Sequence, residues 1–170
     1  YLKQGRHDLA EDRLQKVLRL QPDNPTALAG LAGCRQEQYL FDEALGYYKR
    51  AVEADPKNPD FHFRMGFLAL QLGNLEAAVT ALEKGLELRP NDAEVLFSLA
   101  KAYEQKGDLQ RASEYYTDTL RVNSRADHAA YNLGLAFEAM GKTEEAMNAF
   151  RRASEIKPNE PHYLERLAAV

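Results

Sequence analysis

The sequence predicts an all-α protein in which antiparallel helix pairs follow one another along the chain. Three observations support this fold class: a motif recurs every 34 residues, its turn position is nearly always glycine, and an alanine in each copy precedes a large apolar residue by four positions. The turn positions are Gly5, Tyr39, Gly73, Gly107 and Gly141. The paired positions are Ala10 with Leu14, Ala44 with Tyr48, Ala78 with Leu82, Ala112 with Tyr116 and Ala146 with Phe150. The copies close at Pro22, Pro56, Pro90, Ser124 and Pro158.

Each period contains two helical segments and two turns. Residues 59–72 and 75–88 have the apolar spacing of helices, and Gly73 separates them. A tight turn between antiparallel helices needs a residue that tolerates positive φ, and glycine does so without steric cost. Proline cannot continue a helix, so stretches such as "DPKNP" end one helix pair and begin the next.

The pattern resembles the tetratricopeptide repeat family, whose signature is W-x2-L-G-x2-Y, then A-x3-F, then P, in a unit of 34 residues. The best match is residues 127–160, in which Leu133, Gly134, Phe137, Gly141, Ala146, Phe150, Ala153 and Pro158 stand at the family's positions. The resemblance covers essentially the whole chain and implies a right-handed superhelical solenoid. The signature Trp is absent from every copy. Because Tyr39 replaces a turn glycine and Ser124 a closing proline, we expect a less regular turn at each.

On this spacing the chain is a single array. Residues 1–24 hold the second helix of a partial repeat, and residues 161–170 form the first helix of a further repeat or a cap. The full repeats are residues 25–58, 59–92, 93–126 and 127–160. A repeat buries its apolar face only against its neighbours, so both ends of the array need cover. We therefore interpret the chain as an excerpt of a longer protein.

Composition excludes several classes of partner. The 170 residues are 45% hydrophobic and 28% charged, as in globular proteins. The net charge of −4 is small and both signs are interspersed, so neither nucleic acid nor an anionic membrane surface is expected. The longest apolar stretch, residues 66–72, is too short for membrane insertion. The single cysteine, Cys34, excludes an internal disulfide and fits a cytoplasmic, reducing location.

Comparison of the copies separates packing positions from surface positions. Phe61 and Cys34 belong to a stripe that stays apolar in every copy, so both are expected to pack between helices. Tyr48 and Tyr116 stand at the family's second-helix aromatic position and are expected in the core. A third stripe on the first helices varies among aromatic, small and charged residues, Lys101 among them. We therefore expect this third stripe to be exposed.

The resemblance implies that the third stripe lines a concave groove formed by the first helices. Phe63, Phe97 and Tyr131 are then expected to form an aromatic ladder along it. The predicted peptide-binding residues are Phe63, Arg64, Phe67, Leu70, Phe97, Lys101, Tyr131, Asn132 and Leu135. An amphipathic helix or extended peptide with apolar or aromatic anchors and basic flanks would suit this surface. In the alternative interpretation, Phe63 and Phe67 lean over the neighbouring first helix and thicken the scaffold.

No pattern of residues indicates an enzyme, because the sequence has neither a phosphate-binding loop nor a nucleophile elbow. No catalytic residue, cofactor or metal is expected; His128 and His162 recur at one repeat position but lack a third ligand. The leading hypothesis is a non-enzymatic scaffold or adaptor for protein–protein interaction. Two alternatives stay open: a self-assembling scaffold that forms homo-oligomers through its terminal helices, and a regulatory or recruiting arm of a larger multidomain protein.

Overall fold

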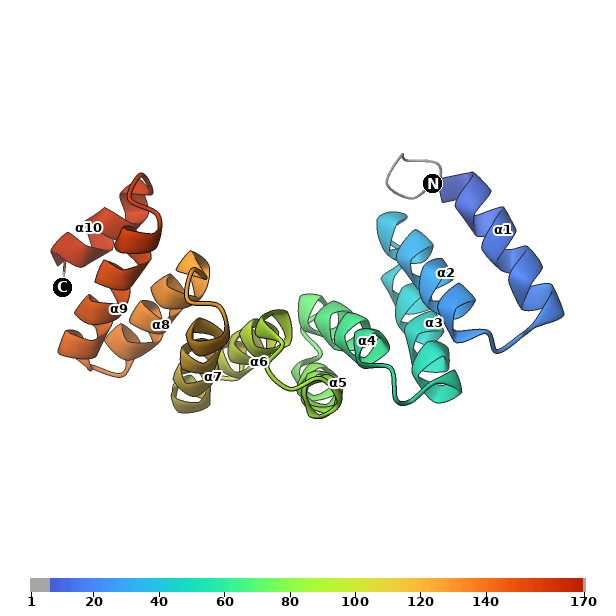
Figure 1. Cartoon of the computed structure of the whole chain (residues 1–170), viewed down its shortest axis with the longest axis horizontal. Helices are drawn as coiled ribbons and strands as arrows, with labels where there is room; N and C mark the ends of the chain where they lie inside the picture. Colours follow the sequence, from blue (N-terminus) through green and yellow to red (C-terminus); the bar gives the residue numbers. More distant parts are fainter. Residues whose placement is uncertain (1–6, 170) are drawn as a thin grey trace. The chain divides into compact units, whose positions relative to one another are not determined.

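The computed structural model describes residues 7–169, which form ten α-helices and no strand (Figure 1). In chain order the helices are α1 (His7–Leu20), α2 (Pro25–Glu37), α3 (Phe41–Ala54), α4 (Pro59–Gln71), α5 (Leu75–Leu88), α6 (Ala93–Gln105), α7 (Leu109–Val122), α8 (Asp127–Ala139), α9 (Thr143–Ile156) and α10 (Pro161–Ala169). The predicted all-α array of helix pairs is confirmed. Within the described residues, no helix has the length and apolar character needed to cross a membrane.

The chain divides into two compact units, Tyr1–Leu88 and Arg89–Val170. In the first unit α2 packs against α3 and α4 against α5, while α1 contacts α2 and α3 contacts α4. In the second unit α6 packs against α7 and α8 against α9, while α7 contacts α8 and α9 contacts α10. Each unit therefore builds its core from helix pairs and from contacts between successive repeats.

Capping side chains determine where three of the first helices begin. Asn24, Asn58 and Asp92 each accept a hydrogen bond from a backbone N–H of the first helical turn, at 2.9 to 3.0 Å. Such caps satisfy N–H groups that have no partner inside the helix. α8 differs, because its cap position holds Ala126 and no side chain accepts a bond there. Local capping interactions therefore repeat with the 34-residue period in these three repeats.

The turn at Tyr39 has the same geometry as the glycine turns. Tyr39 has a φ of 61°, and Gly73, Gly107 and Gly141 have φ of 75°, 80° and 73°. In both turns the backbone N–H of the left-handed residue donates to the carbonyl three residues before it. Tyr39 donates to Gln36 at 3.0 Å, and Gly73 makes the equivalent bond. The expectation of a less regular turn is therefore wrong. Tyrosine adopts the left-handed conformation that the turn requires, at a cost of about 1 to 2 kcal/mol for a residue with a Cβ.

The turn at Ser124 is also regular, so the second expectation of irregularity is wrong. The backbone N–H of Asn123 donates to a helix carbonyl at 2.7 Å, and that of Ala126 donates back to Asn123 at 3.1 Å. In the proline-containing turn, Asp55 and Asn58 make the same two bonds at 3.0 and 3.3 Å. Neither bond uses the N–H that proline lacks, and serine therefore replaces proline without changing the turn.

The positions that stay apolar in every copy are buried as predicted. Tyr48 and Tyr116 are fully buried, and Phe61 and Cys34 are buried as well. Burial raises the pKa of the Cys34 thiol above its ordinary value. The thiol therefore stays protonated at neutral pH, and Cys34 behaves as a small apolar core residue.

Glycine allows two first helices to approach their second helices closely. A Cβ atom at Gly66 would lie 2.8 Å from Cγ of Leu82, and one at Gly134 would lie 2.5 Å from Cε1 of Phe150. Both distances are shorter than van der Waals contact, so a side chain at either position would displace buried atoms. The helix pairs α4/α5 and α8/α9 therefore depend on glycine at their contact.

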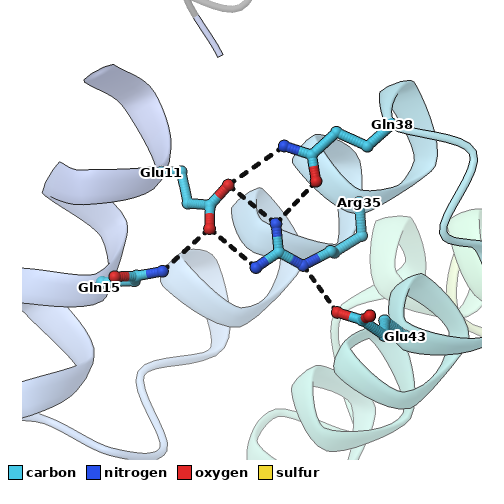
Figure 2. Close-up of polar contacts among 5 residues, drawn as sticks. All are labelled: Glu11, Gln15, Arg35, Gln38 and Glu43. Atoms are coloured by element: carbon cyan, nitrogen blue, oxygen red, sulfur yellow. Dashed lines mark hydrogen bonds and ion pairs between the residues drawn. The ribbon is translucent and has the colours of Figure 1, made fainter. Parts of the chain in front are cut away.

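Arg35 joins three helices through charged hydrogen bonds (Figure 2). Its guanidinium donates to both carboxylate oxygens of Glu11 at 2.8 Å, and its Nε donates to Glu43 at 2.8 Å. Gln38 accepts from the same guanidinium at 2.9 Å, and Gln15 donates to Glu11 at 2.9 Å. Arg35 therefore ties α2 to α1 on one side and to α3 on the other.

Candidate functional site

Phe63 and Phe67 lie side by side on α4, within the predicted peptide-binding stripe. Their ring centroids are 5.8 Å apart. Phe67 is 39% exposed, whereas Phe63 is half-buried. Arg64 is exposed and lies near Tyr48, whose pKa is raised by burial and lowered in part by the Arg64 charge. α4 thus presents an exposed aromatic ring beside a cation.

Leu70 does not belong to this exposed surface, contrary to the prediction. It is only 8% exposed. In the sister repeats the same position contacts the second helix: Gln36 lies 3.4 Å from the hydroxyl of Tyr48, and Glu104 accepts a 2.6 Å hydrogen bond from Tyr116. A polar residue at this position therefore indicates a polar partner on the second helix, and not open solvent as the sequence comparison assumed.

In the second unit, Phe97 contacts the buried Tyr116, and Lys101 pairs with the glutamate that binds the same tyrosine. The ring of Phe97 packs against Tyr116 with centroids 5.7 Å apart. Nζ of Lys101 pairs with Oε2 of Glu104 at 2.7 Å, and the same oxygen accepts the hydrogen bond from the Tyr116 hydroxyl. Burial, and then the bond to Glu104, raises the pKa of Tyr116 far above its usual range. The phenol therefore stays a donor and holds the Glu104–Lys101 pair in place.

Replacing Tyr116 with phenylalanine removes only this donor. We expect the free energy of unfolding to fall by about 1.5 kcal/mol, as for other hydrogen bonds to charged groups. A double-mutant cycle of Tyr116→Phe with Glu104→Gln, followed by denaturant unfolding, should give a coupling energy of about 1 kcal/mol. Zero coupling between Tyr116 and Glu104 would contradict the interaction.

Tyr131 is half-buried and packs against three aromatic rings. Its centroid lies 5.7 Å from that of Phe150, 5.0 Å from Tyr163 and 5.1 Å from His162. Tyr163 and His162 belong to α10, the first helix of the following repeat. The ring on α8 therefore leans over the neighbouring first helix, which is the arrangement that the scaffold alternative describes.

Asn132 and Leu135 are half-buried on α8, so they are partly open to solvent. The predicted ladder of Phe63, Phe97 and Tyr131 combines residues of both compact units. The ladder therefore stays a prediction, while the local surroundings of each ring are those described above.

His128 and His162 surround Tyr163. The Tyr163 hydroxyl donates to Asp127 at 2.8 Å and lies 3.2 Å from Nδ1 of His128, and the ring of His162 packs edge-on against Tyr163 at 4.3 Å. Burial alone would raise the pKa of Asp127, but the bond from Tyr163 and the nearby charges of His128 and Lys157 lower it overall. In residues 7–169, no group of three or more His, Cys, Asp or Glu side chains is arranged to hold a metal ion.

The coupling between first and second helices left a signal in the sequence that a column-by-column comparison misses. Where the core position of the second helix is tyrosine, a polar residue stands twelve positions before it. Where that core position is leucine, leucine also stands twelve positions before it. The pairs are Gln36 with Tyr48, Leu70 with Leu82 and Glu104 with Tyr116. Glu138 departs from this rule and pairs with Arg166 on α10 at 3.3 Å. Comparing pairs of columns would have placed Leu70 in the core.

Known proteins share both the sequence pattern and the fold. Two profiles described as tetratricopeptide repeat match residues 36–102 and residues 1–59 with 99–161. The chain is similar to the CTR9 homolog of Arabidopsis thaliana, with 30% identity over 156 residues, 88% of this chain and 14% of that protein. It is also similar to BBSome complex member BBS4 of Bos taurus, with 27% identity over 170 residues, 100% of this chain and 32% of that protein. The crystal structure of MamA superposes with a TM-score of 0.88 at 25% identity, covering 95% of this chain and 94% of that one.

The chain spans about a third or less of these two curated relatives. The structural likeness agrees with the fold described above. Together the two repeat profiles match every residue from 1 to 161. The chain belongs to the tetratricopeptide repeat family.

Proposed function

We propose that the chain is a non-enzymatic scaffold or adaptor that binds a peptide or helix of a partner protein on its first helices. The observation that carries this proposal is the exposed ring of Phe67 beside Phe63 on α4. The sister repeat on α2 has Ala29 and Gly33 at the same two positions. Since that repeat folds without the rings, the scaffold does not require them, and a contact with a partner explains them.

The expected energy of such a contact is substantial. Burying one phenylalanine side chain against a partner stabilises a complex by about 1.5 to 3 kcal/mol. The same position on α2 is open, because a Cβ added at Gly33 would meet nothing within 4 Å. Aromatic side chains are enriched in the buried centres of protein interfaces. Phe67 is therefore the anchor position that we expect to contribute most.

The charges around the stripe suggest the chemistry of the partner. Asp60 lies exposed in the first turn of α4, which suits a basic flank on a peptide bound at Phe67. Arg64 is exposed on α4 and can donate to a backbone carbonyl or a carboxylate. The charge of Lys101 is already paired with Glu104. We therefore expect apolar or aromatic anchors with basic flanks. A relative named as a member of the BBSome complex supports a role in assembly.

The test is affinity capture from a lysate with three proteins: the intact chain, a Phe67→Asp variant and an Ala77→Asp variant. Ala77 is exposed on α5 of the same repeat, so this control adds the same charge away from the stripe. We expect the intact chain and the control to capture the same proteins and Phe67→Asp to lose them. With a purified partner, Phe67→Asp should weaken binding by about tenfold or more.

Two results would contradict the proposal. If Phe67→Asp captures the same proteins at an unchanged melting temperature, the stripe does not bind them. If Phe67→Asp melts far below the Ala77→Asp control, the ring belongs to the scaffold. The double variant Phe63→Asp, Phe67→Asp then measures how far the half-buried Phe63 contributes to stability.

A specific observation also favours self-association. Leu20 at the end of α1 is 86% exposed, and Leu164 on α10 is 49% exposed, so both terminal helices present apolar side chains. Light scattering separates the two hypotheses, because a monomer whose mass does not change with concentration excludes self-assembly. The curated relatives are much longer than this chain, which favours an arm of a larger protein as a further alternative. The full-length reading frame decides that case.

A further inference from the structure

The turn between α2 and α3 borders a pocket that the predicted stripe does not include. The pocket has a volume of about 350 Å³. Its lining residues are Gln36, Glu37, Tyr39, Phe41, Gln71 and Leu72. Neither Phe63 nor Phe67 lines it. All six lining residues belong to the first compact unit, at the turn ends of α2, α3 and α4.

This turn differs from its three sister turns in having Tyr39 at the left-handed position, and from two of them in lacking a side-chain cap. Tyr39 occupies a left-handed position where the other full repeats have glycine, and it is 80% exposed. Leu40 occupies the N-cap of α3 without a side-chain bond and is 43% exposed. In two sister turns Asn74 and Asp108 cap their helices through side-chain oxygens, whereas Lys142 in the third does not. A tyrosine at a left-handed position costs stability, and its side chain stays 80% exposed, so folding does not explain it.

The pocket combines apolar, aromatic and acidic surface. The rings of Tyr39 and Phe41 pack edge to face with centroids 6.0 Å apart. Leu72 is 41% exposed, at a position where the other repeats have Gln38, Lys106 or Met140. These side chains leave one aromatic face and one aliphatic side chain open to a ligand.

Hydrogen-bond acceptors lie beside this apolar surface. The carboxylate of Glu37 has no hydrogen bond or ion pair with any other residue in the described part of the chain. Nε2 of Gln36 is 3.4 Å from Oε1 of Gln71, a long hydrogen bond that a better donor can replace. The pocket therefore offers an unpaired anion and an exchangeable amide oxygen.

We propose that this pocket binds an arginine side chain of a partner peptide, with an aliphatic residue next to it in the peptide. A guanidinium stacks on an aromatic ring and donates in one plane to a carboxylate and to amide oxygens. The Tyr39 ring, Glu37 and Gln71 provide these three contacts, and Leu72 receives the aliphatic residue. The chain already holds a guanidinium with the same acceptor types, because Arg35 donates to Glu11 and Gln38 (Figure 2). The site is additional to the proposed stripe on α4.

The test is an NMR titration of the ¹⁵N-labelled chain with two capped peptides, Ac-Gly-Leu-Arg-Leu-Gly-NH2 and the same peptide with Glu in place of Arg. We expect the arginine peptide to shift the backbone amides of residues 36–41 and 71–72. The glutamate peptide should bind at least about tenfold more weakly, since it loses both the stacking and the ion pair. Shifts elsewhere, or equal binding of both peptides, would overturn the proposal.

Two variants test the named contacts without disturbing the fold. Tyr39→Gly restores the residue of the sister turns, so the turn is kept while the ring is removed. Glu37→Gln removes the charge and keeps the shape. Each should weaken the arginine peptide by about fivefold to tenfold, whereas Phe67→Asp should leave its binding unchanged. That last comparison separates this site from the stripe.

Three outcomes would reject the pocket as an arginine site. The first is unchanged binding in Tyr39→Gly. The second is a loss of stability in Tyr39→Gly, which would make the ring part of the scaffold. The third is that, without any peptide, the amide signals of residues 36–41 broaden as the protein concentration rises, and that Tyr39→Gly abolishes this broadening. A second copy of the chain would then be the occupant of the pocket.

Discussion

Replacing Gly134 with alanine is expected to lower the free energy of unfolding of the second unit by about 3 kcal/mol, the upper part of the range for overpacked cores. The new Cβ would lie 2.5 Å from Cε1 and 2.6 Å from Cδ1 of Phe150, whose ring is fully buried. The ring cannot move aside without displacing other core atoms. Urea unfolding followed by circular dichroism measures the loss, and hydrogen exchange in residues 127–156 localises it.

The matched control is Gly46→Ala on α3. A Cβ at Gly46 would meet nothing within 4 Å. Alanine has the higher helix propensity, and this variant should therefore gain about 0.5 to 1 kcal/mol. If the free energy of unfolding falls for Gly134→Ala and rises for Gly46→Ala, the loss at Gly134 comes from the helix contact and not from helix propensity. If Gly134→Ala is as stable as the original chain, the close approach of α8 to α9 is incorrect.

Replacing Arg35 with methionine is expected to cost about 2 kcal/mol, as for other hydrogen bonds to charged groups. Methionine keeps the apolar stem but removes every donor to Glu11 and Glu43. Because the Glu11 side chain is only 19% exposed, its carboxylate would stay largely desolvated without a cation. Thermal and denaturant unfolding measure the loss. Lys16→Met is the control, since its ion pair with Asp12 is exposed and should contribute no measurable stability.

The same network makes a prediction about pH. The hydrogen bond from Arg35 lowers the pKa of Glu11 below its ordinary value of 4.5, against the smaller opposing effect of burial. The unfolded chain then binds a proton at higher pH than the folded chain. The contribution of Glu11 is therefore complete above pH 4.5 and is lost as the pH falls through the lowered pKa. As the pH falls below 4.5, the difference in free energy of unfolding between the original chain and Arg35→Met should become smaller. A difference that stays constant with pH would contradict the hydrogen bond between Arg35 and Glu11.

Much of the fold was predictable because its determinants are local. Left-handed turns at Gly73, Gly107 and Gly141 follow from the conformational freedom of glycine. The helix starts at Asn24 and Asn58 follow from capping side chains. These interactions involve residues close in sequence, so the residue types alone indicate them.

The candidate site was less predictable because its determinants lie between helices. The exposed Phe67 was identified correctly as a surface ring, because a sister repeat has lysine at its position. Leu70 was assigned to the surface by the same reasoning but is buried, since its exposure depends on the second-helix residue twelve positions later. Tyr131 was assigned to an open groove, yet Tyr163 and His162 of α10 cover part of its ring.

By itself the sequence determined the helix pairs, their 34-residue spacing and the family to which they belong, because turn, cap and apolar patterns repeat at every copy. It also determined which tyrosines are core residues, since Tyr48 and Tyr116 share one repeat position. Only the tertiary structure decided which variable positions are open. It paired Glu104 with a buried tyrosine and left Tyr39 exposed at a regular turn. The physical reason is that exposure depends on what the adjacent helix places opposite a residue, and a single column of repeat positions does not contain that information.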